Sequence, residues 1–368
     1  MIGLEKGITK EAVRMAWPAV CESFFIALAG MVDSLMVSSM GASAVAAVGL
    51  TTQPKFMGLA LFFAINVSVS ALVARRRGEK NQRSANQILL VAILFVIVAT
   101  VVISSACVMW ANEIINFCGS APETHEPAVI YYRIIMGCMI FNVLSMVINA
   151  AQRGSGNTMI AMRTNIVSNV VNIIANYLLI QGHLGFPALG IAGAAIATVF
   201  GTVIACIMSF ASLFRRDGFV SIYYIMEQQI RPALEPVISI IKLGFSVFIE
   251  QILMRVGFMS TAMMAAKMGT NALAAHQVGM NILGLTFSFG DGMQVAAVAL
   301  IGRSLGEGSP DKAKAYGKTC RMIGLGISCV LAVVYFFGGE WLYHLFFAEQ
   351  EIVDIGVMII RIMIIIVL

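Results

Sequence analysis

Charged residues are scarce in this chain of 368 residues. Asp, Glu, Lys and Arg make up 12% of it, hydrophobic residues make up 59%, and the mean hydropathy is +0.89. A soluble globular domain is nearer 25% charged. The low charge therefore excludes an ordinary soluble domain and favours an integral membrane protein.

The motifs of enzyme and cofactor chemistry are also missing. The seven cysteines form no CxxC pair, so we interpret them as small apolar filler in helices. Walker A, HExxH and GxSxG motifs do not occur. Residues 288–291 (Ser-Phe-Gly-Asp) resemble the GxGD motif of intramembrane aspartyl proteases, but serine replaces the first glycine. We therefore expect neither enzyme activity nor a cofactor.

Long hydrophobic segments are abundant, and each is long enough to cross a bilayer as a helix. Backbone groups cannot remain unpaired in lipid, so these segments must be helical. The sequence predicts ten of them, at residues 12–40, 50–75, 86–111, 127–151, 161–181, 188–214, 239–267, 274–302, 318–339 and 355–368.

The basic residues lie in every second gap between these segments. One side holds Arg153 and clusters at residues 75–83 and 303–321, whereas the other side holds Lys267 alone. The positive-inside rule then places the N-terminus in the cytoplasm, the loop at 75–83 inside and the loop near Glu123 outside. This distribution argues against a nucleic-acid partner despite the net charge of +5. We expect a multi-pass protein of a bacterial cell (inner) membrane.

The chain repeats itself at one constant offset, without a gap. Glu22 meets Glu250, Arg75 meets Arg303, and Arg133 meets Arg361. Copies that start on the same side of the membrane need an even number of helices, and six fit. We predict an all-α integral membrane protein of two parallel six-helix lobes, related by a pseudo-two-fold axis along the membrane normal, with a substrate cleft between them. The N-lobe is residues 1–214 (helices 1–6), a connector covers 215–238, and the C-lobe is residues 239–368.

The second copy stops seven residues after Arg361, whereas the first runs on for about 80 residues beyond Arg133. We therefore expect an incomplete C-lobe, with helices 7–9 and the start of helix 10 present and helices 11 and 12 absent. We also expect that this chain alone neither confers drug resistance nor binds a coupling ion normally.

Two acids lie within the first hydrophobic segment. Glu22 and Asp33 are eleven residues apart, which places them on one helix face, about 16 Å apart along the axis. Ionisable groups in a membrane are functional candidates by default, here for holding a proton or a cation. The alternative for each is a structural acid bonded to a neighbouring helix.

Asparagines form a polar stripe on the fifth segment, at positions 165, 169, 172 and 176, and the fourth has a similar stripe of Asn142, Ser145 and Asn149. Amide oxygens together with a carboxylate can bind a hard cation. Amides that join helices by hydrogen bonds are the alternative.

The second lobe differs chemically from the first. Thr261 stands where Asp33 would repeat, and Arg255 and Asp291 are intramembrane charges of opposite sign. We interpret these two as a structural ion pair, or as groups bonded separately to backbone carbonyls. The methionines, 24 in all, would suit a promiscuous apolar cleft.

Several segments together resemble the multidrug and toxic compound extrusion (MATE) family of cation-coupled efflux carriers, over essentially the whole chain. The segments are Trp17-Pro18 with Glu22, residues 31–33 (Met-Val-Asp), residues 46–50 (Ala-Ala-Val-Gly-Leu), residues 152–158 (Gln-Arg-Gly-Ser-Gly-Asn-Thr), residues 172–180, residues 189–198, residues 273–278 (Leu-Ala-Ala-His-Gln-Val) and residues 302–306 (Gly-Arg-Ser-Leu-Gly).

The resemblance implies twelve helices in two lobes that alternate between inward-open and outward-open states. It also implies a cation site, with Asp33, Asn172 and Glu250 matching family positions. Asn176 departs from the aspartate of one family branch, and the acidic partner of Glu250 would lie beyond residue 368. The coupling group that we predict is Asp33, Asn172, Asn176, Glu250 and Thr198, with Na+ at Asp33 and Asn172 or at Glu250. The cleft candidates are Glu22, Gln53, Asn66, Asn149, Asn169, His276 and Asp291, although His276 also fits a helix cap.

The sequence thus favours a secondary active antiporter that exports organic, cationic or amphipathic compounds in exchange for Na+ or H+. A lipid-linked sugar flippase of the same superfamily is a second interpretation; it would need a more basic cavity than the acids and amides noted above. A non-transporting fragment is a third. We expect small organic substrates and the bilayer as partners and a monomer as the working form, although nothing in the sequence fixes the oligomeric state.

Overall fold

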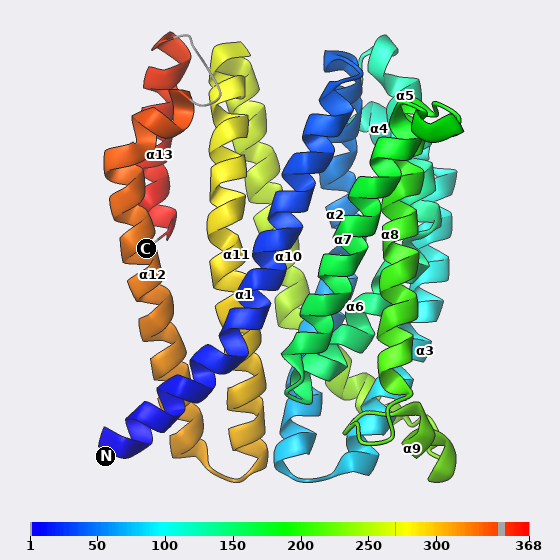
Figure 1. Ribbon diagram of the computed structural model, residues 1–368, viewed down its shortest axis with the longest axis vertical. Helices are drawn as coiled ribbons and strands as arrows, with labels where there is room; N and C mark the ends of the chain where they lie inside the picture. Colours follow the sequence, from blue (N-terminus) through cyan, green and yellow to red (C-terminus); the bar gives the residue numbers. More distant parts are fainter. Residues whose placement is uncertain (1, 269, 345–349, 368) are drawn as a thin grey trace.

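The computed structural model describes residues 2–268, 270–344 and 350–367. Within these ranges the chain is helical and contains no strand (Figure 1), which confirms the all-α class. The helices are α1 Ile2–Ser38, α2 Ala42–Gly78, α3 Gln82–Met109, α4 Ala111–Phe117, α5 Pro122–Gly137, α6 Met139–Gly154, α7 Thr158–Ile180, a 3-10 turn His183–Gly185, α8 Gly190–Leu213, α9 Ile222–Glu227, α10 Leu234–Met268, α11 Thr270–Gly306, α12 Pro310–His344 and α13 Gln350–Val367.

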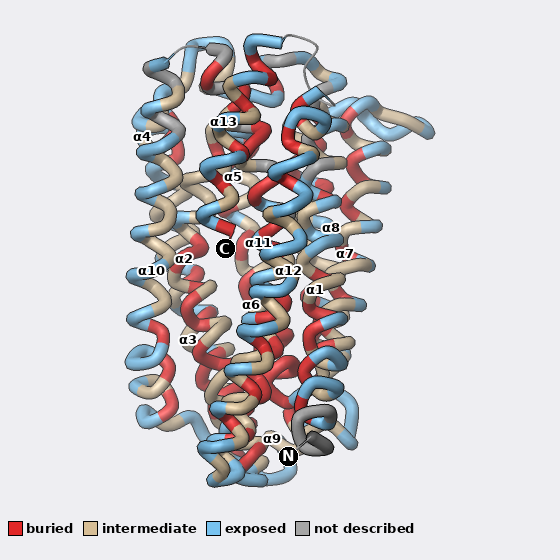
Figure 2. Tube along the Cα trace, turned by 90° about the vertical axis from the view of Figure 1, so that its left-hand side faces the viewer, coloured by how far each residue is buried: buried red, intermediate tan, exposed pale blue. Residues whose placement is uncertain are grey.

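The outer surface of the bundle is apolar, as contact with lipid requires. Exposed residues lie on the outward sides of the helices and buried residues on the sides that face one another (Figure 2). Large side chains such as Val98, Phe200 and Phe337 are more than half exposed. By length and composition, seven of the described helices can cross a membrane, or eight if α5 and α6 form one bent span. The chain is therefore a multi-pass membrane protein.

The predicted hydrophobic segments each correspond to a helix, with two differences. The segment predicted as one helix at 127–151 is broken at Cys138 into α5 and α6, which meet at 46°. Helix α7 and helix α13 fall outside the seven apolar spans; α7 carries the asparagine stripe, and α13 carries Glu351, Asp354 and Arg361. In both helices, polar or charged side chains interrupt the apolar run.

The helix boundaries repeat at the offset that relates Glu22 to Glu250 in the sequence. Helix α2 runs from Ala42 to Gly78, and α11 runs between the two equivalent positions, Thr270 and Gly306. The starts of α3 and α12, and of α5 and α13, are equivalent in the same way. This is the pattern that two parallel structural repeats produce. We use N-lobe for α1–α8 and C-lobe for α10–α13.

The first helix of each lobe packs on the other lobe. Helix α1 crosses the molecule diagonally, from beside α11 and α12 at its start to α7 at its end (Figure 1). Helix α10 packs mainly against α2 and also contacts α3. The lobes are therefore held together by two crossing helices that occupy equivalent places in the repeat.

A very close contact between the two lobes lies at the end of the molecule that carries the N-terminus and the loops 79–81 and 307–309, at the bottom of Figure 1. We call it the basic end. A Cβ added at Gly78 would lie 2.0 Å from the carbonyl oxygen of Arg303, and one added at Gly306 would lie 2.0 Å from that of Arg75. The contact is reciprocal, because Gly78 and Arg75 are the repeat equivalents of Gly306 and Arg303. Glycine at both positions lets α2 and α11 touch backbone to backbone.

Helices α7 and α8 also pack very closely, at two glycines of α8. Added Cβ atoms at Gly193 and Gly201 would lie 2.4 Å from the oxygen of Leu179 and 2.9 Å from that of Ser168, and the Ser168 hydroxyl donates to the Gly201 carbonyl at 2.8 Å. Small residues allow such close contact between membrane helices. This packing holds the asparagine face of α7 against α8.

Candidate functional site

A cavity of about 730 Å³ lies between the lobes, a size typical of small-molecule sites. Its walls come from α1, α2, α5, α6, α7 and α8 of the N-lobe and from α10 and α11 of the C-lobe. The charged residues that line it are three acids and three bases: Glu22, Glu250 and Asp291, and Lys55, Arg153 and Arg255.

Asp33 lies beside this cavity, in a polar cluster formed by α1, α7 and α8. The Asn176 amide donates to Asp33 Oδ1 at 2.6 Å. Asn172 and Asn176 are buried, one turn apart on α7, and the Thr198 hydroxyl lies 3.3 Å from the Asn172 amide nitrogen. Thr198 also lines the cavity, so it links the cluster to the substrate space. Asp33 thus lies within reach of Asn176, as the sequence predicts, and its role in coupling stays a prediction.

The side-chain amide of Asn172 can turn either its oxygen or its nitrogen toward the Asp33 carboxylate. With its nitrogen turned to Asp33 it donates to Oδ1 at 2.8 Å and Oδ2 at 3.2 Å, and its oxygen accepts from the Thr198 backbone at 3.2 Å. The Asn176 Oδ1 atom is buried and has no hydrogen-bond partner. A buried acceptor beside a carboxylate is suited to a cation with oxygen ligands. A group of three or more His, Cys, Asp or Glu side chains that could hold a metal does not occur among the described residues.

Lys55 brings a positive charge to the same region, and it was not among the residues predicted for the site. It lies on α2 within the hydrophobic segment, lines the cavity, and its charge interacts with that of Asp33. The pair is not a tight one, because no described ion pair within 4.0 Å includes either residue. Lys55 therefore lies close enough to Asp33 for their charges to interact, and it also lines the cavity.

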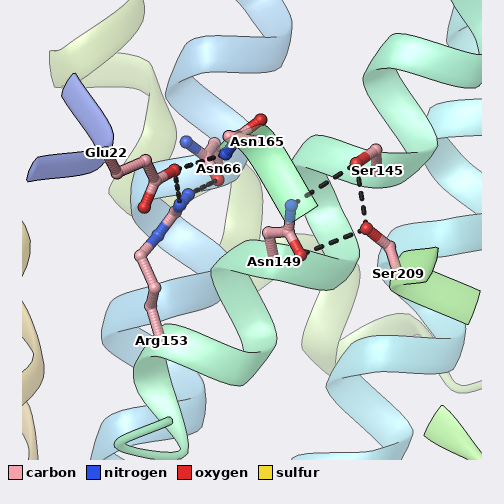
Figure 3. Close-up of polar contacts among 7 residues, drawn as sticks. All are labelled: Glu22, Asn66, Ser145, Asn149, Arg153, Asn165 and Ser209. Carbon is pink, nitrogen blue, oxygen red and sulfur yellow. Dashed lines mark hydrogen bonds and ion pairs between the residues drawn. The ribbon is translucent and has the colours of Figure 1, made fainter. Parts of the chain in front are cut away.

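Glu22 is held in a buried ion pair (Figure 3). Arg153 donates to Glu22 Oε1 at 3.0 Å, and Asn165 donates to the same oxygen at 2.6 Å. The second guanidinium nitrogen of Arg153 donates to Asn66 at 3.1 Å. Glu22 and Arg153 are only 7% and 8% exposed. Of the two interpretations for Glu22, this geometry fits the structural one: an acid fixed between α1, α2, α6 and α7.

The structure corrects the position that the charge pattern predicted for Arg153. The pattern of basic residues grouped it with the cytoplasmic loops, but its side chain leaves the last turn of α6 and points into the bundle toward Glu22. The other predicted cleft amides differ in their surroundings. Asn149 is buried and bonded to Ser145 and Ser209 (Figure 3), Asn169 lines the cavity with a buried, unpartnered Nδ2, and Gln53 has a buried, unpartnered Oε1 outside the cavity wall.

The C-lobe residues face the cavity from the opposite side. Glu250 and Asp291 are both exposed and line it. Of the two interpretations for Asp291 and Arg255, the ion pair does not form: their charges interact, but no described ion pair within 4.0 Å joins them. Arg255 instead lies over the Phe56 ring, 4.4 Å from its centroid. Here the arginine stacks on an aromatic face from the other lobe.

The structure does not bring all predicted coupling residues together. Glu250 lies in the cavity wall on α10, away from the Asp33 cluster on α1, α7 and α8. His276 is half-buried on α11 and does not line the cavity. The two sets of predicted coupling residues therefore belong to different lobes.

The predicted site omitted Lys55 and Arg153, and the sequence carries a signal for the first of them. Lys55 is a lone charge inside an apolar segment, which marks it as a candidate by default. Arg153 belongs to the motif at residues 152–158, but its buried partner lies 131 residues away on α1. Only the arrangement of the helices in space could reveal that pair.

Two repeated helical lobes in a membrane, with a polar cavity between them and a carboxylate–amide cluster beside it, define the class of protein as a membrane transporter. The sequence matches the MatE family over residues 18–178 and 246–368, and the chain belongs to that family. It is similar to the probable multidrug resistance protein NorM of Thermotoga maritima, with 26% identity over 351 residues that cover 95% of this chain and 74% of the relative.

Solved structures show the same fold. An outward-facing MATE family multidrug resistance transporter of the MOP superfamily has a TM-score of 0.89 and 24% identity, covering 99% of this chain and 80% of that chain. A MOP superfamily transporter from Pyrococcus furiosus, described as having a binding pocket of reverse polarity, has a TM-score of 0.87 and 22% identity, covering 98% and 79%.

Proposed function

We propose that the protein is a cation-coupled antiporter that exports organic, amphipathic compounds by alternating access, with Na+ or H+ as the coupling ion. One observation carries this proposal. The Asp33 carboxylate sits among Asn172, Asn176 and Thr198, next to the interlobe cavity but outside its wall. An ion at Asp33 would therefore alter the N-lobe without occupying the substrate space.

Coupling would act through charge and helix packing. A cation or proton on Asp33 removes a negative charge that now interacts with Lys55 and accepts from Asn176. The amides must then turn or shift, which changes how α1 and α7 fit together. Because α1 also packs on α11 of the other lobe, a change at Asp33 reaches the lobe interface directly.

The orientation follows from the basic loops. We place the basic end in the cytoplasm. The contact of Gly78 and Gly306 then closes the cytoplasmic side in this conformation, and its opening would admit substrate from the cell.

The substrate space suits organic compounds that carry charge. Glu250 and Asp291 offer carboxylates to a positively charged group, and flexible side chains such as Met139, Met146 and Met254 line the wall. The relative in Thermotoga maritima carries the name of a multidrug resistance protein. Export of cationic or amphipathic compounds agrees with both.

The flippase alternative gains some support from the cavity, because basic residues are present there although the sequence predicted only acids and amides. Lys55, Arg153 and Arg255 all line the cavity. However, Arg153 is neutralised by Glu22, and the other two are matched in number by Glu250 and Asp291. An anionic lipid carrier would need a clear excess of positive charge, so the exporter remains the better account.

Reconstitution tests the proposal. The complete gene product would be placed in liposomes loaded with a fluorescent cationic dye, and Na+ and H+ gradients would be imposed separately. We expect one of the two gradients to drive dye movement against its own concentration difference. Movement that neither gradient drives would refute an ion-coupled antiporter.

A further inference from the structure

The central cavity contains an unassigned pair of cations that meet on one aromatic ring. Lys55 Nζ lies 5.3 Å and Arg255 Cζ 4.4 Å from the centroid of Phe56. Lys55 and Phe56 belong to α2 of the N-lobe and Arg255 to α10 of the C-lobe. All three line the cavity.

Neither cation is in direct contact with a carboxylate, although the charges of Asp33 and Asp291 reach Lys55 and Arg255 respectively. No described ion pair within 4.0 Å includes Lys55 or Arg255. The Nε atom of Arg255 is buried and has no hydrogen-bond partner. A buried N–H without an acceptor costs free energy unless a ligand supplies one. Two cations at one ring, one of them with a buried free donor, form a site for an anionic group.

The surroundings define the rest of the ligand. Phe63 lies beside Phe56, with ring centroids 6.3 Å apart, and both line the cavity, so a flat apolar body can lie next to the cations. Glu250 and Asp291 line the same cavity and contribute two negative charges to its wall. With Glu22 and Arg153 paired to each other, the remaining charges of the wall are two positive and two negative.

We propose that Lys55 and Arg255 form an anion subsite of the cavity, which binds a carboxylate or sulfonate of an aromatic compound. This deepens the proposed function, on which it rests, by naming the residues that bind an acidic group of the substrate. A purely cationic compound leaves Lys55 and Arg255 unpaired, and a purely anionic one leaves Glu250 and Asp291 unpaired. A molecule with both charges satisfies both sets.

The subsite also lies across the lobe interface. An anionic group held by Lys55 and Arg255 binds α2 and α10 at once, and these helices already pack on each other. Substrate binding would therefore favour the conformation in which the two residues stand on the same ring.

A matched pair of dyes tests the subsite without transport. Rhodamine B carries a free carboxylate and a cationic ring system; its ethyl ester keeps the rings and the cation but masks the carboxylate. Binding of each to the complete protein in nanodiscs, with no ion gradient, is measured by fluorescence anisotropy, and binding to empty nanodiscs is subtracted. We expect the acid to bind more tightly than the ester.

The variants separate the subsite from general effects. Lys55→Gln and Arg255→Gln should each weaken the acid roughly tenfold and leave the ester within about twofold. Lys55→Arg and Arg255→Lys should keep the preference, which shows that charge and not fold is responsible. Lys242→Gln, an exposed change on the same helix as Arg255, is the control.

An ester that binds as well as the acid, equal losses for both dyes in the glutamine variants, or absence of binding by both dyes would overturn the anion subsite. These outcomes are independent of the ion-coupling proposal, because a protein can fail here and still drive dye movement with an ion gradient.

Discussion

Alanine at Gly78 or Gly306 should push the two lobes apart at the basic end. The added Cβ would lie 2.0 Å from a backbone carbonyl oxygen of the other lobe, at Arg303 or Arg75 respectively, and an ordinary contact needs about 3.4 Å. Backbone atoms cannot rotate away as side chains can. The helices α2 and α11 must therefore separate by roughly the difference between these two distances.

The energetic effect can be bounded. Overpacking of a tight contact costs about 1–3 kcal/mol, which corresponds to a shift of about 5- to 150-fold in a two-state equilibrium. Only conformations with the basic end closed bear this cost. Each substitution should therefore populate the open form, and because the contact is reciprocal, the two should act in the same direction and to a similar extent.

Spin labels can report the separation directly. Arg83 and Asp311 are exposed and occupy equivalent repeat positions near the starts of α3 and α12, and each would be changed to cysteine in a version whose seven native cysteines are replaced. The distance between the two labels, measured by double electron–electron resonance, should lengthen for Gly78→Ala and for Gly306→Ala. Gly257→Ala, at a glycine with nothing within 4 Å of an added Cβ, should change nothing. Unchanged distances in both variants, or an effect of one alone, would refute the reciprocal contact.

Two further outcomes are expected. Glu22→Gln and Arg153→Met each break the buried ion pair, and each should destabilise the protein by about 3–5 kcal/mol. The double variant should lose less stability than the sum of the two single variants; additive losses of thermal stability would show that the pair is not coupled. The pKa of Glu307 lies below its ordinary value of 4.5, because partial desolvation, which raises it, is outweighed by the Lys312 hydrogen bond and the charges of Lys312 and Arg303. A depressed carboxyl pKa stabilises the folded arrangement above the unfolded pKa, and this is lost as pH falls through the folded value. The label distances at the basic end should therefore broaden in acid below about pH 4.5, and Glu307→Gln should remove that response; identical profiles would contradict the assignment.

The helices were predictable from the sequence because their signal is local and long. Apolar runs locate them, and the internal repeat recurs in the structure at the starts of α2 and α11. The Asp33 cluster could also be predicted, because Asn172 and Asn176 share a face of one helix and Asp33 is one of two acids on the predicted inner face of α1.

The rest depended on how helices dock. Arg153 stands at a helix end, where a basic residue ordinarily faces the cytoplasm, and its bond to Glu22 depends on how the helices of the N-lobe are arranged. Arg255 had two available partners, Asp291 on its own lobe and Phe56 on the other; the contact of α10 with α2 selects Phe56. The break at Cys138 lies within a continuous apolar run, so hydropathy gives no sign of it.

The coupling role of Asp33 is the central claim, and uphill transport tests it most directly. In liposomes that contain the complete gene product, dye accumulation against its gradient is compared with dye exchange at equal concentrations, for Asp33→Asn and for the exposed control Asp217→Asn. We expect Asp33→Asn to retain exchange but to lose all ion-driven accumulation, and Asp217→Asn to keep both. Accumulation by Asp33→Asn at the level of the unmodified protein would contradict the claim.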